Sequence, residues 1–290
     1  MEKEVSDWIQ SKLDLLGEAA NFVTLMTLAI GDNRIDVMDF LVSQRDDLNA
    51  DINAPGGEDG ETILHFVAYT GNVDAMRWLI DQRGAKMDAR NAKGQTPMFI
   101  LAGCGHTEAM RCLKERYADL DLNAKDGVGR TPLFLAVSAG KTESIECLSK
   151  LGANMDAQDN QGSTALHNAV LGAVHGDPSV DYVNVVGCLM DNNAKIDDNS
   201  PMTPVVYAIA QGQVALLDCM VNKGATVRPI DLFAAAGEGQ IGVMEYLKRH
   251  FAGRWDDVVN AKLGDMTPRL VAEGQGKTEA AAWLRANGAK

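Results

Sequence analysis

The sequence predicts an all-α fold, a solenoid of stacked helix–turn–helix units with connecting β-hairpin loops. The first observation is a four-residue phrase that begins with Thr and recurs along the chain. Its copies start at Thr62, Thr96, Thr131, Thr164, Thr203 and Thr267. The first four are 34, 35 and 33 residues apart, and the fifth follows after 39. A repeat of this length indicates units that each pack only on their neighbours.

The second observation is the composition of the chain. A length of 290 residues would suggest about two globular domains, but a solenoid grows along one axis and needs no single core. Apolar residues make up 46% of the chain, which excludes disorder as the main state. A solenoid presents a long surface rather than a deep pocket, and this favours a binding protein over an enzyme.

The unit that begins at Thr131 shows why each phrase is expected to start a helix. Thr131 can cap the helix by accepting a hydrogen bond from a backbone N–H. Pro132 suits the first helical position, where its missing N–H costs nothing. The short apolar helix ends at Gly140, and a second helix runs to Gly152. A hairpin at residues 158–162 then leads to the next Thr.

These residues resemble the ankyrin repeat, with its T-P-L-H-x-A phrase, its mid-repeat Gly and its terminal G-A-x-x-N-A. The resemblance covers about residues 20–290 and suggests a stand-alone array of the bacterial type. The terminal phrase stands at 84–89, 152–157 and 224–227, and in part at 121–124 and 258–261. The resemblance implies the ankyrin-repeat solenoid and a non-catalytic role in protein binding.

The expected organisation has four parts and eight helix pairs, the two end units included. The parts are a capping helix at 1–17, an N-terminal cap repeat with its loop at 18–61, central repeats at 62–266 and a C-terminal capping repeat at 267–290. Both ends of a solenoid need a unit with one polar face.

Three departures from the repeat stand out. Extra residues near 173–182 fall between the two helices of one unit, and the connection at 251–257 is lengthened. The link at 226–229 is so short that its hairpin is almost deleted. Insertions in a solenoid often lie on a binding face, although neutral drift explains them equally well. Trp255, in the second insertion, is expected to be exposed.

Cysteine usage indicates a core position rather than a chemical site. Four cysteines occupy one position of the second helix, and tryptophan occupies it in two other units. These residues are Cys112, Cys147, Cys188 and Cys219, with Trp78 and Trp283. A position that takes Cys or Trp is expected to be apolar and buried. Structural zinc is not expected, because the chain has no Cys-x-x-Cys motif.

Three histidines are expected to support the repeat. His65 and His167 stand at the His position of the ankyrin phrase, and His106 follows a mid-repeat glycine. The ring at the phrase position is expected to hydrogen-bond backbone between neighbouring units. A catalytic or metal-binding role is therefore the weaker interpretation.

No catalytic motif supports an enzyme, and neither a cofactor, a metal nor a small-molecule substrate is expected. The triplets at 140–142 and 276–278 end like a phosphate-binding loop but lack its first glycine. An enzyme with its site at an inserted loop remains the third hypothesis. Its candidate residues are His175, Asp177, Asp181 and Trp255.

The charge of the chain bears on its partners and compartment. The formal net charge is −13, from 40 acidic and 27 basic residues. Negative charge disfavours nucleic acid and anionic membranes and permits a basic protein partner, although it also serves solubility alone. The acidic N-terminus is unlike a signal peptide, so we expect a cytoplasmic protein, or a periplasmic or secreted one if a signal peptide was removed.

The predicted binding surface is the concave face, formed by the hairpin tips and the exposed side of the first helices. The candidate partner-binding residues are Tyr69, Arg90, Lys93, Lys125, Asp126, Arg130, Gln158, Asp159, Arg228 and Trp255. Arg and Tyr often anchor protein interfaces. Of Tyr69→Ala and Arg130→Ala, one is expected to weaken binding, and both to leave stability nearly unchanged. For any single residue, plain solvation is the simpler interpretation.

The resemblance implies a protein that clamps one folded partner, and it does not name that partner. A specific version is an inhibitor or immunity protein that covers the active site of a toxin or hydrolase, as several bacterial ankyrin proteins do. The alternative is a secreted bacterial effector that binds a host protein. A neighbouring toxin gene would favour the first, and a C-terminal secretion signal the second.

Overall fold

The computed structural model describes residues 2–16, 22–43, 52–56, 59–196 and 203–290. Two compact units make up the chain, Met1–Gly162 and Ser163–Lys290. The predicted boundary between residues 17 and 18 lies outside the described residues.

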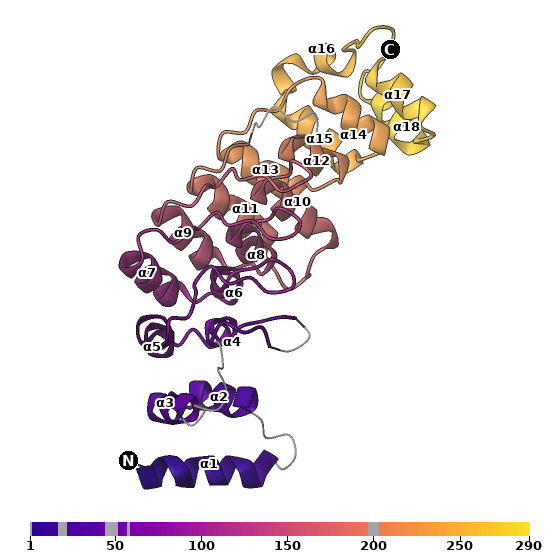
Figure 1. Ribbon diagram of the computed structural model, residues 1–290. Helices are drawn as coiled ribbons and strands as arrows, with labels where there is room; N and C mark the ends of the chain where they lie inside the picture. Colours follow the sequence, from indigo (N-terminus) through magenta and orange to yellow (C-terminus); the bar gives the residue numbers. More distant parts are fainter. Residues whose placement is uncertain (1, 17–21, 44–51, 57–58, 197–202) are drawn as a thin grey trace. The chain divides into compact units, whose positions relative to one another are not determined.

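The first unit contains a leading helix and four helix pairs. They are α1 (Glu2–Leu16), α2 (Phe22–Gly31), α3 (Ile35–Ser43), α4 (Ile63–Thr70), α5 (Val73–Arg83), α6 (Pro97–Cys104), α7 (Thr107–Arg116), α8 (Pro132–Ser138) and α9 (Thr142–Lys150). The first helices α4, α6 and α8 pack side by side, as do the second helices α5, α7 and α9 (Figure 1). At the N-terminal end, α1 packs on α3 and buries Val5.

The second unit contains four further pairs and two additional short helices, η2 and α16. They are α10 (Ala165–His175), α11 (Tyr182–Asp191), α12 (Pro204–Ala210), α13 (Val214–Asn222), α14 (Asp231–Glu238), α15 (Ile241–His250), η2 (Ala252–Arg254), α16 (Trp255–Val259), α17 (Pro268–Gly274) and α18 (Thr278–Ala286). First helices again pack on first helices, in the order α10, α12, α14 and α17.

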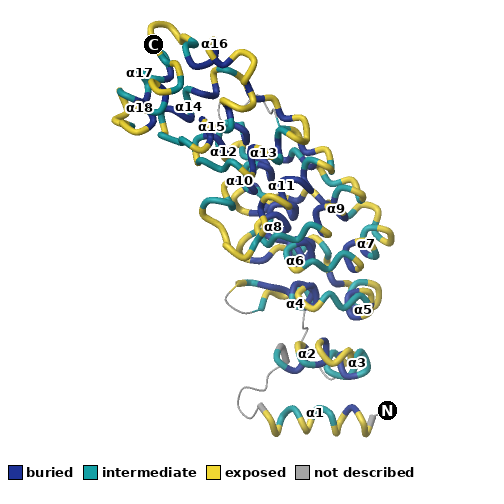
Figure 2. Tube along the Cα trace, turned by 180° about the vertical axis from the view of Figure 1, so that it is seen from behind, coloured by how far each residue is buried: buried dark blue, intermediate teal, exposed yellow. Residues whose placement is uncertain are grey.

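The expected eight helix pairs are therefore all present among the described residues, and the predicted all-α solenoid fold is confirmed. Isolated β-bridges pair Gly56 with Glu61 and Leu263 with Met266. The buried residues lie mainly on the helices, while the connecting loops are mostly exposed or intermediate (Figure 2).

The repeated Thr begins a helix in every copy, but its side chain does not always cap it. The Thr203 and Thr267 hydroxyls accept from the N–H groups of Val206 and Leu270, at 3.4 and 3.3 Å. The Thr131 hydroxyl is buried and has no hydrogen-bond partner. The predicted cap at Thr131 is therefore wrong, although its backbone has the extended conformation of an N-cap.

His65 joins two repeats as expected for its position in the phrase, and His106 makes a similar link. Nδ1 of His65 accepts from the Thr62 backbone N–H at 3.2 Å, and its Nε2 bonds the Gln95 carbonyl of the next repeat at 2.9 Å. Nε2 of His106 likewise bonds the Tyr69 carbonyl of the preceding repeat at 2.9 Å. These bonds satisfy backbone carbonyls between stacked units.

The position that the four cysteines share is buried in some repeats and half-buried in others. Cys147 and Cys188 are buried, whereas Cys112 and Cys219 are half-buried. At Cys112 the expectation of a plain apolar contact is wrong, because the Arg77 guanidinium donates to its sulfur.

The two insertions adopt compact structures. The first lengthens α10, and the Tyr182 ring packs so closely on Gly172 and Gly176 that a Cβ at either glycine would lie within 2.5 Å of it. The second forms η2 and α16. Trp255 begins α16 and is only 8% exposed. Its indole N–H donates to the Asn287 carbonyl at 2.7 Å, and its ring meets Trp283 edge to face. The predicted exposure of Trp255 is therefore wrong.

Candidate protein-interaction surface

The hairpin tips of the first unit are joined into one continuous ledge. In three successive hairpins, the second residue of the turn donates its backbone N–H to a carbonyl of the preceding hairpin. These bonds run from Ala92 to Asp59 at 2.8 Å, from Gly127 to Lys93 at 2.9 Å and from Asn160 to Val128 at 3.1 Å. The backbone of the ledge is therefore fixed by its own hydrogen bonds.

The predicted basic tip residues reinforce this ledge. Arg90 donates to the carbonyls of Gly94 and Lys125, at 2.7 and 2.6 Å. Lys125 donates in turn to the Gln158 carbonyl at 2.8 Å, and Lys93 lies 3.5 Å from the Asp59 carboxylate. These side chains are exposed and retain donors that face water. They are thus held in place before any partner arrives.

Asp126 differs from the other candidates because its side chain is only 1% exposed. Its Oδ1 accepts from the N–H groups of Val128 and Arg130, at 3.0 and 2.9 Å. Its Oδ2 accepts from Nε and Nη2 of Arg130, at 3.1 and 3.0 Å. The predicted surface role of Asp126 does not fit this burial, since its carboxylate organises the hairpin from within.

The fourth hairpin tip, at residues 158–162, contributes polar side chains but no large side chain that could anchor a partner. Gln158 is exposed, and Asp159 accepts from the Gln161 N–H at 2.8 Å. In the second unit, Arg228 repeats the Arg130 arrangement with a different spacing. Its backbone N–H and its guanidinium donate to the buried Asp231 carboxylate, at 2.7 and 3.2 Å.

Among the described residues, Tyr69 is the largest exposed side chain on the first helices of the first unit. It lies on α4 and is 48% exposed. Its hydroxyl donates to Oε1 of the buried Glu61 at 2.9 Å. Burial, and then the Glu61 carboxylate, raise the pKa of Tyr69 to about 12, so the hydroxyl stays protonated at neutral pH. Glu61 was not predicted from the sequence, and its position just before the Thr phrase is the only signal.

The neighbouring positions on α6 and α8 carry small side chains. Gly103 and Ser138 correspond to Tyr69 in the repeat, and Cys104 follows Gly103. A Cβ at Gly103 would lie 3.6 Å from Leu135 of the next repeat. The repeats next to Tyr69 therefore carry only small side chains at the equivalent positions. This leaves room for a side chain of a partner to pack on the exposed Tyr69 ring.

Three of the four residues of the enzyme hypothesis make structural contacts. Asp177 accepts from the backbone and hydroxyl of Ser179, at 2.8 and 2.7 Å, and Asp181 caps α11 through the Asn184 N–H at 3.1 Å. Trp255 is buried as described above, and His175 is exposed at the end of α10. Among the described residues, no hydrogen bond or ion pair joins any two of these four.

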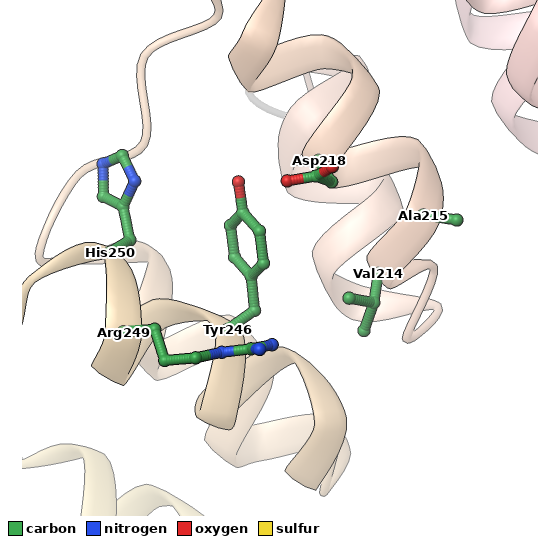
Figure 3. Close-up of a pocket in the computed structure, with 6 residues that line it drawn as sticks. All are labelled: Val214, Ala215, Asp218, Tyr246, Arg249 and His250. Carbon is green, nitrogen blue, oxygen red and sulfur yellow. The ribbon is translucent and has the colours of Figure 1, made fainter.

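A groove of about 720 Å³ lies between the second helices α13 and α15 (Figure 3). Its lining residues are Val214, Ala215, Asp218, Tyr246, Arg249 and His250. Burial, and then the Asp218 carboxylate, raise the pKa of Tyr246. The Tyr246 hydroxyl points toward Asp218, and its ring stacks on His250 with centroids 6.3 Å apart.

Comparison with known proteins defines the class. The family description "Ankyrin repeats (3 copies)" matches residues 25–126 and 118–180. This chain therefore belongs to the ankyrin-repeat family. Such proteins are typically non-catalytic interaction modules.

Individual relatives share only part of their length with the chain. It is 34% identical over 73 residues to the I-Kappa-B like protein C2 of Microplitis demolitor bracovirus, which covers 25% of this chain and 40% of that protein. It is 27% identical over 215 residues to human Rabankyrin-5, covering 71% of this chain but 18% of the relative. It thus spans less than half the length of both relatives.

The ankyrin repeat domain of Bcl-3, a member of the IkappaB protein family, is similar in structure. The TM-score is 0.59 at 23% identity, and the match covers 70% of this chain and 86% of that one. At this identity the likeness shows the fold alone. Among the helices that the structure describes, none is long and apolar enough to cross a membrane.

Proposed function

We propose that the chain is a non-catalytic module that binds a folded partner protein through its hairpin ledge and first helices. The observation that carries this is the ledge itself, whose successive tips in the first unit are linked by backbone hydrogen bonds. A surface ordered before binding loses little conformational entropy on association. The exposed Tyr69 ring beside the ledge supplies an anchor of the type that dominates interfaces.

The contact residues proposed are those candidates that the surface exposes or half-exposes. They are Tyr69, Arg90, Lys93, Lys125, Arg130, Gln158, Asp159 and Arg228. Asp126 and Trp255 are left out because both are buried. The finer proposal is that the partner is an enzyme or toxin whose active site the module covers. The rigid ledge supports the part of this proposal that concerns a folded partner, because a surface fixed before binding suits a partner that is itself folded.

The test is capture of a partner by the full chain from the native cell, followed by cross-linking and mass spectrometry. We expect one stoichiometric protein with cross-links to Lys93 and Lys125. Tyr69→Ala should weaken its binding by about 1–3 kcal/mol. Tyr246→Ala, the same change on the second helix α15, is the matched control and should bind normally. Equal effects of the two variants, or no stoichiometric protein, would count against the proposal.

A further inference from the structure

The local charge of the ledge is opposite to the charge of the whole chain. The formal net charge of the chain is −13. The tips of its second and third hairpins, residues 89–96 and 124–131, nevertheless carry four basic side chains and one acidic side chain. The acid is Asp126, which is buried and accepts from the Arg130 guanidinium, so these two charges match within the hairpin. The other three cations leave the middle of the ledge positive.

Two of these cations, Arg90 and Lys125, have no acidic partner among the described residues. Both side chains are exposed, and the groups that they bond are neutral backbone carbonyls, which do not cancel a charge. Lys93 lies 3.5 Å from the Asp59 carboxylate, but the two side chains are 63% and 62% exposed, so this ion pair is weak. The unmatched charge is therefore centred on Arg90 and Lys125.

The Arg90 guanidinium is held in place with one edge open. Its Nη1 donates to the carbonyls of Gly94 and Lys125, which uses both hydrogens of that nitrogen. Within the described part of the chain, its Nε and Nη2 have no acceptor. These two nitrogens form an edge that binds both oxygens of a carboxylate. Arg34 uses the same edge to bind both oxygens of Asp36, at 2.8 and 2.7 Å.

The neighbouring tip supplies a second cation and an apolar contact. The Lys125 ammonium donates to the Gln158 carbonyl at 2.8 Å and has two further donors. Because Arg90 bonds the backbone carbonyl of Lys125, the two cations belong to tips that touch each other. Val128, on the same tip as Lys125, is 53% exposed. Two preoriented cations and an apolar side chain thus lie on adjacent tips.

We propose that the partner protein binds the middle of the ledge with an acidic surface. One carboxylate of the partner binds the Nε and Nη2 edge of Arg90, and a second binds the Lys125 ammonium. Complementary charges of this kind fix the register of an interface and disfavour wrong partners. The basic partner that the net charge permits would be repelled at this surface. This inference rests on the proposed function and specifies the chemistry of the partner at the ledge.

Phosphate groups of a nucleic acid carry the same sign of charge, but this surface suits them less well. Affinity for nucleic acid comes from neutralising many phosphates, about 6–10 in a typical complex. The second and third tips offer two unmatched cations. The first and fourth tips carry Asp59 and Asp159, which are exposed and half-exposed. A phosphate backbone that followed the ledge would therefore meet carboxylates on both sides of the cations, whereas two carboxylates of a protein fit between them.

The test is selection of a random 12-residue peptide display library against the full chain, with affinities then measured by fluorescence anisotropy. We expect the enriched peptides to contain at least two Asp or Glu residues in excess of the starting library. Arg90→Gln and Lys125→Gln should each weaken these peptides about tenfold. Arg111→Gln is the matched control, because Arg111 is an exposed arginine on the second helix α7. It should bind as the unchanged chain does.

A charge reversal separates lost contact from lost folding. The chain with both Arg90→Glu and Lys125→Glu should enrich peptides rich in Lys and Arg, a result that an unfolded variant cannot give. Arg90→Lys keeps the charge but removes the two-nitrogen edge, so its affinity for the acidic peptides should lie between those of Arg90→Gln and the unchanged chain.

Three results would overturn the proposal. The first is a selection that enriches no acidic peptide, or acidic peptides that bind Arg90→Gln and Arg111→Gln equally well. The second is a 12-residue oligothymidylate that binds as tightly as the acidic peptides, which would favour nucleic acid instead. The third is a captured partner that Tyr69→Ala weakens and Arg90→Gln does not. This last result would leave the proposed function standing.

Discussion

Replacement of Arg130 by alanine should destabilise the chain, because Arg130 neutralises a buried carboxylate. Loss of one partner of a fully buried pair costs about 3–5 kcal/mol. Two features reduce that figure here. The Arg130 side chain is 40% exposed, so solvent screens the pair. Asp126 also keeps its bonds from the N–H groups of Val128 and Arg130. We therefore expect a loss of about 1–2 kcal/mol.

The measurement is urea unfolding of the full chain, followed by circular dichroism and fitted with a common slope. Lys125→Ala is the matched control: its ammonium bonds only an exposed carbonyl, so its loss should stay within about 0.5 kcal/mol. Asp126→Ala should cost about 2–4 kcal/mol, since it strips two backbone N–H groups of their acceptor and leaves the guanidinium alone. An Arg130→Ala variant as stable as Lys125→Ala would refute this reasoning and restore the expectation from the sequence.

Three further predictions concern the core. Leu133→Ala removes a fully buried side chain and should cost about 2–5 kcal/mol by urea unfolding. Trp255→Ala should cost about 3–5 kcal/mol, and a value below about 1 would place its ring in solvent. Burial lowers the pKa of His65 below its ordinary 6.5, so the unfolded chain binds more protons and stability falls as pH drops below 6.5. His65→Phe, the residue that Phe99 and Phe134 provide in other repeats, should flatten that part of the pH profile. An unchanged profile in this variant would contradict the assignment.

The helix pairs were predictable because their signals are local. The Thr phrase, the mid-repeat glycine and the apolar spacing all lie within one repeat, and each acts on its own helix. The inter-repeat hydrogen bond of His65 followed from the same pattern, since its ring occupies the His position of the phrase.

The predictions that failed did so for one of two physical reasons. Either the residue contacts another that is distant in the sequence, or it makes a hydrogen bond that its residue type does not reveal. Trp255 is buried by Asn287 and Trp283, about one repeat further along the chain. The residue type and position of Asp126 predict a solvated tip residue, but the fold of its hairpin turns the carboxylate inward. Tip residues are polar whether their side chains face water or the inside of the hairpin, so residue type alone does not show which of these two orientations a side chain has.

The most direct test of the central claim is hydrogen–deuterium exchange of the full chain with and without its captured partner. Binding through the ledge predicts new protection at the hairpin tips and the exposed side of the first helices, at residues 90–95, 125–130 and 66–70 of the first unit. The amides of the second helices α5, α7 and α9 should exchange as before. Protection confined to those second helices would contradict the account.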